Sequence, residues 1–282
     1  MATNNMKPTT NGRRNQIAAD FGQITTKKPV KSLLVVRKQN SGRNNQGRIT
    51  SRHRGGGVKR FIRIVNFNLA PGTIATIEHI EYDPGRTARI ARIRDQKGNL
   101  HYVVANADMK QGQTIKVASA DQTVAIENGN RLPLRDMPLG AIVNNIELTP
   151  GRGAQVVRAA GAKAQLTAKE GDFAMVKMPS GEVRKFRLDC MATLGTIGNE
   201  GHQNVKSGYA GRHRKLGIRP HVRGKAMNAC DHPHGGGDGG QHGTGKAPRT
   251  PWGKLALGVK TRRRKQTDKM IVRSRHESKR RK

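Results

Sequence analysis

The sequence contains few acidic residues, few aromatic residues, two cysteines and no long apolar run. Of its 282 residues, 19 are Asp or Glu and 3% are aromatic. Two cysteines are too few for a disulfide framework and fit a reducing compartment. No apolar run approaches the roughly 18 residues of a membrane span, and the first residues lack the apolar stretch of a secretory signal. We therefore exclude a disulfide-built protein and expect neither secretion nor a membrane span.

The sequence is also too polar for one large hydrophobic core. Hydrophobic residues make up 34% of the chain, and 34 residues are Gly. Apolar burial must offset the conformational entropy lost on folding, and this composition supplies too little of it for every position. We expect one or two small folded units with much unfolded chain around them.

Positive charge is abundant and lies mainly in the two ends of the chain. Lys and Arg number 54, and the formal net charge is +35. Residues 1–60 contain 14 basic and one acidic residue, residues 61–198 contain 18 and 13, and residues 199–282 contain 22 and five. Such ends repel themselves and become compact only beside a polyanion. Nucleic acid has the required linear charge density.

A membrane surface is the competing polyanion. The segment that binds it is typically a basic amphipathic helix with Leu, Phe or Trp on one face. Glycine interrupts both ends of this chain at short intervals, so neither end contains such a helix. We expect no membrane partner.

The middle of the chain has the two-residue hydrophobic period of β-strands. Turn signals such as Asp83-Pro84-Gly85 and Pro179-Ser180-Gly181 separate its short apolar segments. Short strands at this spacing are typical of small antiparallel barrels. The pattern indicates no helix of three turns, and residues 191–194 allow only a turn. The predicted strands lie within residues 61–67, 100–104, 115–117, 142–148, 173–178 and 183–188.

We predict a mainly β protein with two small barrels between two basic extensions. A polar segment at residues 128–140 divides the middle of the chain into halves of the size of small barrels. The predicted parts are a first extension at 1–60, a first barrel at 61–128, a second barrel at 129–198 and a second extension at 199–282. The alternative is that the middle forms one larger sandwich.

In the first extension, arginine alternates with Asn, Gly and Ser. Arginine donates bidentate hydrogen bonds to phosphate, and glycine lets the backbone approach closely. A soluble tail would usually include acidic residues, so we favour nucleic-acid binding over a solvated tail. The candidate binding residues are Arg43, Asn44, Arg48, Arg52, His53, Arg54, Lys59 and Arg60.

The second extension repeats this chemistry. Seven of the 14 residues from 232 to 245 are Gly, so we expect no packed core there. Trp252 lies between Pro251 and Gly253 and is suited to stacking on a base or sugar; the alternative is that it anchors the tail on the protein's own barrel. The other candidates are Arg212, His213, Arg214, Arg219, Arg223, Lys225, Asn228, His232, His234, Lys246, Arg249, Lys254, Arg262, Arg263, Arg264, Lys269 and Arg273.

A histidine cluster in this extension raises the question of a metal or catalytic site. Cys230, His232, His234 and His242 lie within 13 residues but match no paired Cys/His spacing. A catalytic pair of Asp231 and His232 lacks an evident nucleophile or oxyanion cradle. We expect no metal site, no catalytic residue and no cofactor of the protein's own.

At these motifs the sequence resembles the L-two proteins of the large ribosomal subunit, in their bacterial or organellar form. The similarity runs from about Lys7 to the end of the chain. The matching stretches are residues 42–50, 52–53, 55–57, 81–84, 151–161, 189–190, 192–195, 222–224, 228, 231–237, 250–253, 267–269 and 271–273.

The resemblance implies an OB-fold barrel followed by an SH3-like barrel, with extensions that thread into ribosomal RNA. It implies a non-enzymatic, primary rRNA binder near the peptidyl-transferase centre that helps subunit joining and tRNA placement. The implied partners are large-subunit rRNA, neighbouring ribosomal proteins and the small subunit, with no homo-oligomer. No cofactor is implied, and the sequence leaves open whether Mg²⁺ is shared with rRNA phosphates. The implied location is a cytoplasmic ribosome, with an organellar ribosome as the alternative.

Three residues match family positions of known interest. Arg86 and Arg158 match positions associated with rRNA contact, and His232 matches a histidine once proposed to assist peptide-bond formation. Because RNA carries the ribosome's chemistry, we interpret His232 as a positioning contact. The sequence departs from the family pattern at residues 229–230 and 240 and at Gly85.

Two other classes of function stay open at this stage. The composition also permits a histone-like protein that compacts DNA, although the ordered motifs argue against it. The histidine cluster permits a His-dependent transferase or metalloenzyme centred on residues 231–234.

Overall fold

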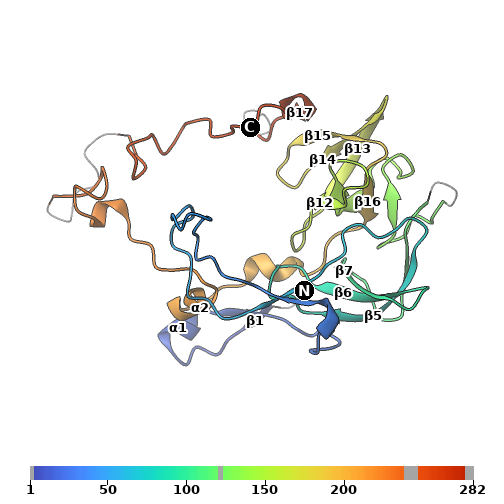
Figure 1. The fold of residues 1–282 in the computed structure, drawn as a ribbon, viewed down its shortest axis with the longest axis horizontal. Helices are drawn as coiled ribbons and strands as arrows, with labels where there is room; N and C mark the ends of the chain where they lie inside the picture. Colours follow the sequence, from blue (N-terminus) through green and yellow to red (C-terminus); the bar gives the residue numbers. More distant parts are fainter. Residues whose placement is uncertain (1–2, 120–122, 238–246, 277–282) are drawn as a thin grey trace. The chain divides into compact units, whose positions relative to one another are not determined.

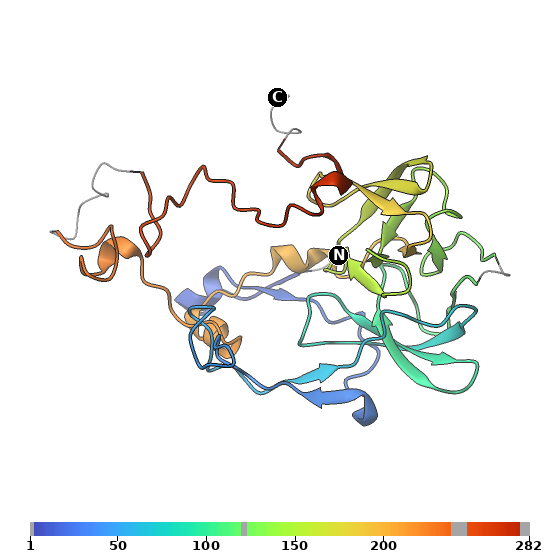
Figure 2. The ribbon, with the colours of Figure 1, turned by 45° about the horizontal axis from the view of Figure 1, so that its top comes forward.

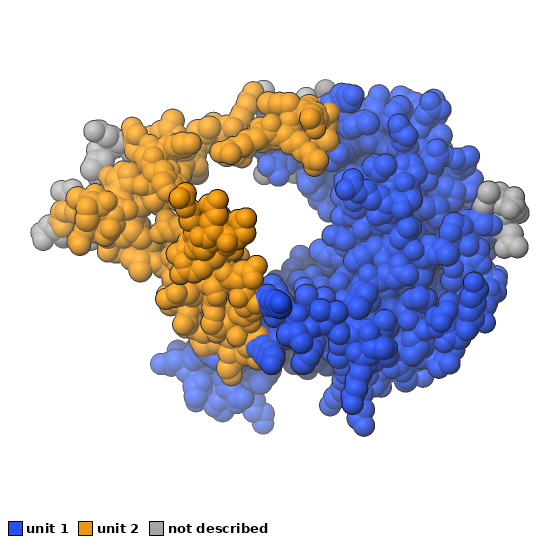
Figure 3. All heavy atoms as spheres, in the orientation of Figure 1, with its two compact units in different colours: residues 1–38, 59–209, 269–282 blue, residues 39–58, 210–268 orange. Residues whose placement is uncertain are grey.

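The computed structural model describes residues 3–119, 123–237 and 247–276. The chain divides into two compact units, coloured separately in Figure 3. Unit 1 comprises residues 1–38, 59–209 and 269–282, and unit 2 comprises residues 39–58 and 210–268. Each unit therefore combines segments that are far apart in the sequence.

The first half of unit 1 contains an antiparallel sheet of four strands in the order β7-β6-β5-β8, of which β5, β6 and β7 are labelled in Figure 1. Alternate side chains on these strands face one core, in which Ile77, Ile93 and Ile115 are almost fully buried. A register shift between Ile77 and His79 bends β5, as a bulge does when a sheet curls into a barrel. The strands are β5 (Ile74–Glu81), β6 (Ile90–Asp95), β7 (Leu100–Val104) and β8 (Thr114–Lys116).

The second half of unit 1 contains a sheet of seven strands in the order β17-β15-β14-β13-β10-β16-β9. Its core includes Leu134, Leu166 and Phe186. The last strand comes from the far end of the chain and pairs with the edge strand β15 (Figures 1 and 2). The strands are β9 (Arg131–Pro133), β10 (Ile142–Asn144), β13 (Ala164–Glu170), β14 (Phe173–Lys177), β15 (Val183–Arg187), β16 (Met191–Leu194) and β17 (Ile271–Arg273).

A third apolar cluster joins the two halves of unit 1. Ala88 and Val104 from the first half are buried with Ile197 from the second, and Val65 and Phe67 pack against them. Hydrogen bonds cross the same junction, because the Asn106 side chain donates to the Leu194 carbonyl oxygen at 2.6 Å. The two halves of unit 1 are therefore in direct contact rather than linked by a free segment.

The remaining elements are short. Strand β1 pairs with β2, β3 with β4, and β11 with β12. The longest described helix, α2, has six residues. None of the described helices is long and apolar enough to cross a membrane. These elements are β1 (Thr3–Asn5), α1 (Asn11–Arg14), β2 (Ile17–Ala19), η1 (Lys31–Leu33), β3 (Leu34–Val36), β4 (Phe61–Arg63), β11 (Ile146–Glu147), β12 (Ala154–Val156), η2 (Glu200–Asn204), α2 (Ala210–Lys215), η3 (Gly224–Ala226) and η4 (Asp268–Met270).

The structure confirms the mainly β fold and corrects several predicted elements. The predicted turn at residues 191–194 is the strand β16, because pairing with both β9 and β10 fixes it in mid-sheet. The predicted strand at 142–148 is divided at Asn145, whose φ is 49°. Of the segment predicted as a strand at 61–67, only the first three residues form one, the strand β4. The boundaries at 60, 128 and 198 stay predictions.

Three long strands, β5, β6 and β13, were not predicted from the sequence. In β5 and β13 a register shift interrupts the alternation of apolar and polar residues, between Ile77 and His79 and between Leu166 and Ala168. In β6 the adjacent residues Ile90 and Ala91 are both fully buried. A search for a strict two-residue period misses such strands.

Candidate nucleic-acid interface

A tight loop in unit 2 presents the basic residues of the first extension. The backbone N–H groups of Thr50 and Ser51 both donate to the Gly42 carbonyl oxygen, at 2.9 and 3.0 Å. The φ of Gly42 is +72°, and a Cβ atom there would collide with the Ser51 carbonyl oxygen. This position therefore needs glycine, both for its backbone angle and for the close approach.

Asn44 shapes the same loop from within. Its side-chain oxygen accepts hydrogen bonds from the backbone N–H groups of Gln46 at 3.0 Å and of Arg48 at 2.9 Å. The side chain of Arg43 donates to the Gly47 carbonyl oxygen at 3.1 Å. Both arginines are exposed. The loop thus uses its own amides for its conformation and leaves most arginine donors for a partner.

The two extensions meet in unit 2, although more than 150 residues separate them in the sequence. Residues 53–58 run beside residues 215–219, and the Gly55 N–H donates to the Gly217 carbonyl oxygen at 2.9 Å. A Cβ atom on Gly57 would lie 2.9 Å from the backbone of Gly217, so the two segments are nearly in backbone contact. In two further backbone hydrogen bonds, the Val58 N–H donates to the Lys215 carbonyl oxygen and the Arg219 N–H donates to the His53 carbonyl oxygen.

The described members of the histidine cluster, Cys230, His232 and His234, lie in a tightly wound loop of unit 2. His232 is 8% exposed, and its ring packs so closely on Gly224 that a Cβ atom there would collide with it. Its Nδ1 accepts the backbone N–H of His234 at 3.0 Å. An accepting nitrogen carries no proton, so the remaining ring proton of His232 is on Nε2. The His234 Nε2 in turn accepts the Arg249 backbone N–H at 2.7 Å.

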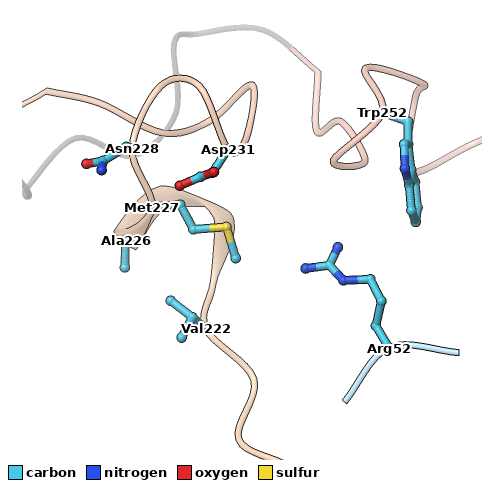
Figure 4. A pocket seen from close by; sticks show the side chains of 7 residues that line it. All are labelled: Arg52, Val222, Ala226, Met227, Asn228, Asp231 and Trp252. Carbon is cyan, nitrogen blue, oxygen red and sulfur yellow. The ribbon is translucent and has the colours of Figure 1, made fainter. Parts of the chain in front are cut away.

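An open hollow of about 650 Å³ lies in unit 2 beside this loop (Figure 4). Trp252 lines it and is 75% exposed, and the guanidinium carbon of Arg52 is 6.0 Å from the centroid of its ring. Figure 4 shows the ring edge-on, with Met227 and Asp231 across the hollow. An arginine at this distance attracts the ring without covering it. A ring this exposed is not an apolar anchor, so a face of Trp252 is available for stacking.

In unit 1, two arginines from different parts of the chain lie over one phenylalanine ring. The guanidinium carbon of Arg158 is 4.6 Å from the Phe67 centroid, and that of Arg86 is 5.5 Å away. Asp83 is buried and accepts from the Arg86 Nε at 2.7 Å. Arg158 donates to the Ala154 carbonyl oxygen at 3.2 Å. Each guanidinium therefore has a fixed orientation and keeps further N–H donors.

The structure divides the predicted binding residues between the two units. Lys59, Arg60, Arg86, Arg158, Lys269 and Arg273 belong to unit 1, and the rest belong to unit 2. Most are exposed, and His232 is the buried one. Lys246 lies outside the described residues, and so does His242 of the histidine cluster. Those of intermediate exposure are His53, Arg60, Arg86, Arg212, Lys225 and His234.

Two residues at this interface were not predicted as site residues. The Phe67 ring contacts the guanidinium groups of Arg86 and Arg158, and the Asp83 carboxylate orients Arg86. The sequence contained a signal for Asp83, because an Asp two residues before a turn glycine commonly accepts the glycine N–H in an Asx turn. In the structure the Asp83 Oδ1 accepts the Gly85 N–H at 2.7 Å. No signal identified Phe67, since only the packed fold brings Arg86 and Arg158 to it.

The described residues contain no group of three or more His, Cys, Asp or Glu side chains that could hold a metal ion. Of the two cysteines, Cys190 is buried and Cys230 is exposed. Burial, together with the nearby Glu147 carboxylate, raises the pKa of the Cys190 thiol to about 11. This thiol is therefore protonated near neutral pH and is a poor nucleophile.

Comparison with protein families identifies the chain. Residues 30–117 match the model described as Ribosomal Proteins L2, RNA binding N-terminal domain. Residues 127–253 match the model described as Ribosomal Proteins L2, C-terminal domain. The chain belongs to the ribosomal protein L2 family. Together the two matches cover most of the chain, in the order of the two sheets of unit 1.

Membership of the L2 family shows the kind of partner that the chain binds. Proteins of this family are RNA-binding components of the large ribosomal subunit, and the OB and SH3-like folds are consistent with the two sheets described above. The chain is therefore an RNA-binding protein of the large ribosomal subunit. The N-terminal match contains Phe67 and Arg86, and the C-terminal match contains Arg158 and Trp252.

Proposed function

We propose that this chain is a primary binder of large-subunit rRNA that organises rRNA near the peptidyl-transferase region without catalysing a reaction. In this role it supports subunit association and tRNA placement. The observation that carries the proposal is that both extensions use backbone groups to hold each other while their basic side chains stay exposed. Such a surface is already shaped for a polyanion.

The charge of unit 2 supports this role. Residues 39–58 and 210–268 contain 18 Lys or Arg and three acidic residues. Among their described residues only His232 is buried, so no apolar core offsets the repulsion between these charges. Phosphates of folded RNA neutralise such a surface, and release of their counterions supplies affinity.

The Phe67 cluster, with Arg86 and Arg158 over its ring, supports recognition beyond charge. A guanidinium held by a ring and by Asp83 loses less entropy on binding than a free one. Arg86 and Arg158 come from opposite sides of the junction between the two halves of unit 1. Their guanidinium groups therefore bind two phosphates only when these phosphates have one particular spacing and orientation. A folded RNA offers such a geometry, whereas a uniform duplex does not.

The proposal extends to partners and location. Neighbouring ribosomal proteins and the small subunit are the expected protein contacts, and we expect no membrane contact and no homo-oligomer. Mg²⁺ ions bound to rRNA phosphates are shared with the protein, which needs no cofactor of its own. A cytoplasmic ribosome is the expected location, and an organellar ribosome is the alternative.

The test compares binding of the full chain to large-subunit rRNA and to duplex DNA of equal length, over a salt series. Polycation binding weakens alike for both, with log affinity falling about linearly in log salt. We expect rRNA to bind about a thousandfold more tightly at physiological salt, as specific complexes do. Equal binding at every salt concentration would favour a DNA-compacting protein instead.

Charge-matched variants separate recognition from charge in the same assay. Arg86→Met and Arg158→Met should each reduce the preference for rRNA over DNA. Arg187→Met removes the same charge from an exposed position of β15 outside the candidate site and should leave this preference intact. Equal effects of all three variants would contradict recognition by the Phe67 cluster.

The absence of catalysis has its own test. Ribosomes assembled with a His232→Ala chain should form peptide bonds at the normal rate once assembly is complete. A loss of peptide-bond formation in fully assembled ribosomes would overturn a purely structural role for His232.

A further inference from the structure

A two-stranded ribbon in unit 1 leaves several large apolar side chains exposed. Strands β3 and β4 form a sheet of their own, with Val35 opposite Ile62 and Val36 opposite Phe61 (Figure 2, in two shades of blue). These four side chains are between 42% and 51% exposed. A ribbon of two strands is at best marginally stable in water by itself. The ribbon therefore needs an anchor, and its exposed apolar side chains indicate a binding partner.

The anchor is Tyr102, a fully buried residue of the first sheet. Its hydroxyl oxygen accepts the Val30 N–H at 2.9 Å, just before β3, and its carbonyl oxygen accepts the Asn66 N–H at 2.8 Å, just after β4. The same hydroxyl donates to the Glu81 carboxylate at 2.8 Å. Both strands are thus fixed at one end to the first sheet, so the ribbon presents a defined surface to a partner.

The two faces of the ribbon differ in charge. Residues directly opposite each other in an antiparallel pair, and alternate residues along a strand, point to the same face. The pairing continues beyond β4, because the Ile64 N–H donates to the Leu33 carbonyl oxygen at 3.0 Å. One face therefore contains the exposed side chains of Val35, Ile62 and Ile64, and Arg63 lies on the other. We call the first of these the aliphatic face.

The charge along this part of the chain is entirely positive. The sequence has no Asp or Glu between residues 21 and 77. The carboxylates of Glu81 and Asp83, at the end of β5, are buried and bonded within the protein. A partner that complements this charge is therefore anionic. The basic residues that flank the two strands are Lys31, Arg37, Lys38, Lys59 and Arg60.

A groove of RNA combines negative charge with a surface that an apolar face can contact. Phosphates border the groove, and riboses and base edges form its floor. In A-form RNA the major groove is deep and narrow, whereas the minor groove is wide and shallow. Paired strands lie about 4.8 Å apart, so the ribbon can lie flat in the wide groove. A protein strand added to an open edge of the ribbon is the competing partner, but it would gain nothing from the positive flanks.

We propose that the aliphatic face docks in the minor groove of an rRNA helix, with Val35, Ile62 and Ile64 against riboses and the flanking lysines and arginines at phosphates. The inference rests on the proposed rRNA-binding function and adds a place of contact to it. Docking of this kind buries apolar area without adding ion pairs. Its share of the affinity therefore does not depend on salt.

The first experiment measures binding of the full chain to large-subunit rRNA over a salt series. Val35→Ala together with Ile62→Ala removes apolar area from the aliphatic face and no charge. We expect the affinity to fall about tenfold or more at every salt concentration, with an unchanged slope of log affinity against log salt. The matched control, Val36→Ala together with Phe61→Ala, removes the other cross-strand pair from the opposite face and should keep the affinity.

The control also loses a cross-strand apolar pair, so a difference between the two variants reports the docking face rather than the stability of the ribbon. Thermal unfolding shows which variants remain folded, and Val35→Ala alone carries the test if the pair variant does not fold. Equal affinities of the two pair variants would overturn the proposal. The proposed function would then still stand if the unchanged chain prefers rRNA to duplex DNA, whereas the lack of that preference would refute the function itself.

The second experiment locates the contact on the RNA. Hydroxyl radicals cleave RNA at riboses that solvent reaches, so a docked face protects them. We expect the unchanged chain to protect riboses on both strands of one helix across its minor groove, and the Val35→Ala, Ile62→Ala variant to leave these riboses exposed. Newly exposed riboses in a single-stranded loop, or none at all, would overturn docking in a groove. Normal protection with poor incorporation into the large subunit would assign the face to a neighbouring protein and also overturn the proposal.

Discussion

Unit 1 and unit 2 differ in what holds their residues in place. Every buried hydrophobic residue that the structure describes lies between Ala75 and Ile197, inside unit 1. In the described part of unit 2 the one buried residue is His232, and it packs on a glycine. Unit 1 is thus stabilised mainly by apolar burial, whereas unit 2 is shaped by turns, glycine contacts and backbone hydrogen bonds.

This difference relates stability to function. Apolar burial does not depend on a partner, so unit 1 supplies fixed positions for Arg86 and Arg158. The conformation of unit 2 gains little from burial, so we expect its shape to become stable only when RNA neutralises its charge. A substitution in the core of unit 1 should therefore lower the free energy of unfolding, whereas a substitution in unit 2 should lower the affinity for rRNA.

The largest effect is expected for Leu166→Ala in the core of the second sheet. Leu166 is fully buried, and loss of its side chain should lower the free energy of unfolding by about 2–5 kcal/mol. Leu257→Ala is the matched control in unit 2, where Leu257 is 71% exposed; it should change that free energy by about 0.5 kcal/mol or less. Urea unfolding followed by circular dichroism measures both, and equal losses would refute the comparison.

Alkaline pH should weaken unit 1 through Tyr102. Burial, aided by the Glu81 carboxylate, raises the pKa of Tyr102 to about 12. The unfolded chain therefore releases this proton at lower pH than the folded chain, and stability falls as pH rises from the ordinary tyrosine pKa of about 10 towards 12. The fall is on the order of 2 kcal/mol.

Tyr102→Phe should remove this pH-dependent component and the corresponding step in the phenolate absorbance titration. Tyr209→Phe, at an exposed tyrosine of unit 1, is the control that should retain both. An identical alkaline profile for the unchanged protein and Tyr102→Phe would show that Tyr102 is not the group responsible.

Trp252→Ala should weaken rRNA binding without destabilising unit 1. Stacking of one base on an aromatic ring contributes about 1–3 kcal/mol, which corresponds to roughly a five- to 150-fold loss of affinity. The unfolding free energy should stay unchanged, because Trp252 is exposed. Leu257→Ala again serves as the control in the binding assay. Full affinity in Trp252→Ala would exclude base stacking at this ring.

The smallest effect is expected from glycine substitutions in the loop of the first extension. Gly42→Ala forces a Cβ atom against the Ser51 carbonyl oxygen, whereas the Cβ of Gly47→Ala meets nothing within 4 Å. Both glycines have positive φ, so each substitution should cost about 1–2 kcal/mol locally. Only Gly42→Ala adds a collision. It should therefore weaken rRNA binding more than Gly47→Ala, with the unfolding of unit 1 unchanged in both.

The local pattern of the sequence was sufficient for several strands and insufficient for others. Segments with regular alternation, such as β14 and β15, were predicted close to their observed bounds. Strand β16 was predicted as a turn, because its four residues acquire strand geometry from two neighbours that are distant in the sequence. Bulges hid β5 and β13, since a shifted register breaks the period that sequence reading relies on.

The candidate site shows the same division. The exposed arginines of both extensions were predicted, because charge and composition are properties of the sequence itself. Their arrangement was not predicted: the pairing of residues 53–58 with 215–219, the position of Arg52 beside Trp252, and the two arginines over Phe67. Likewise, the glycine-rich composition around His232 predicted no packing, yet the structure buries this ring against Gly224.

By itself, the sequence determined that this protein is a mainly β polycation with the motifs of its ribosomal family. These follow from composition, charge and local period, which need no knowledge of distant contacts. Only the tertiary structure decided which guanidiniums share a ring, that Arg131 and Glu147 form a buried ion pair at 2.8 Å, and that Val35 and Ile62 share one face of a ribbon. Such contacts depend on chain segments far apart in sequence, because burial and hydrogen bonding are satisfied jointly when the whole fold packs.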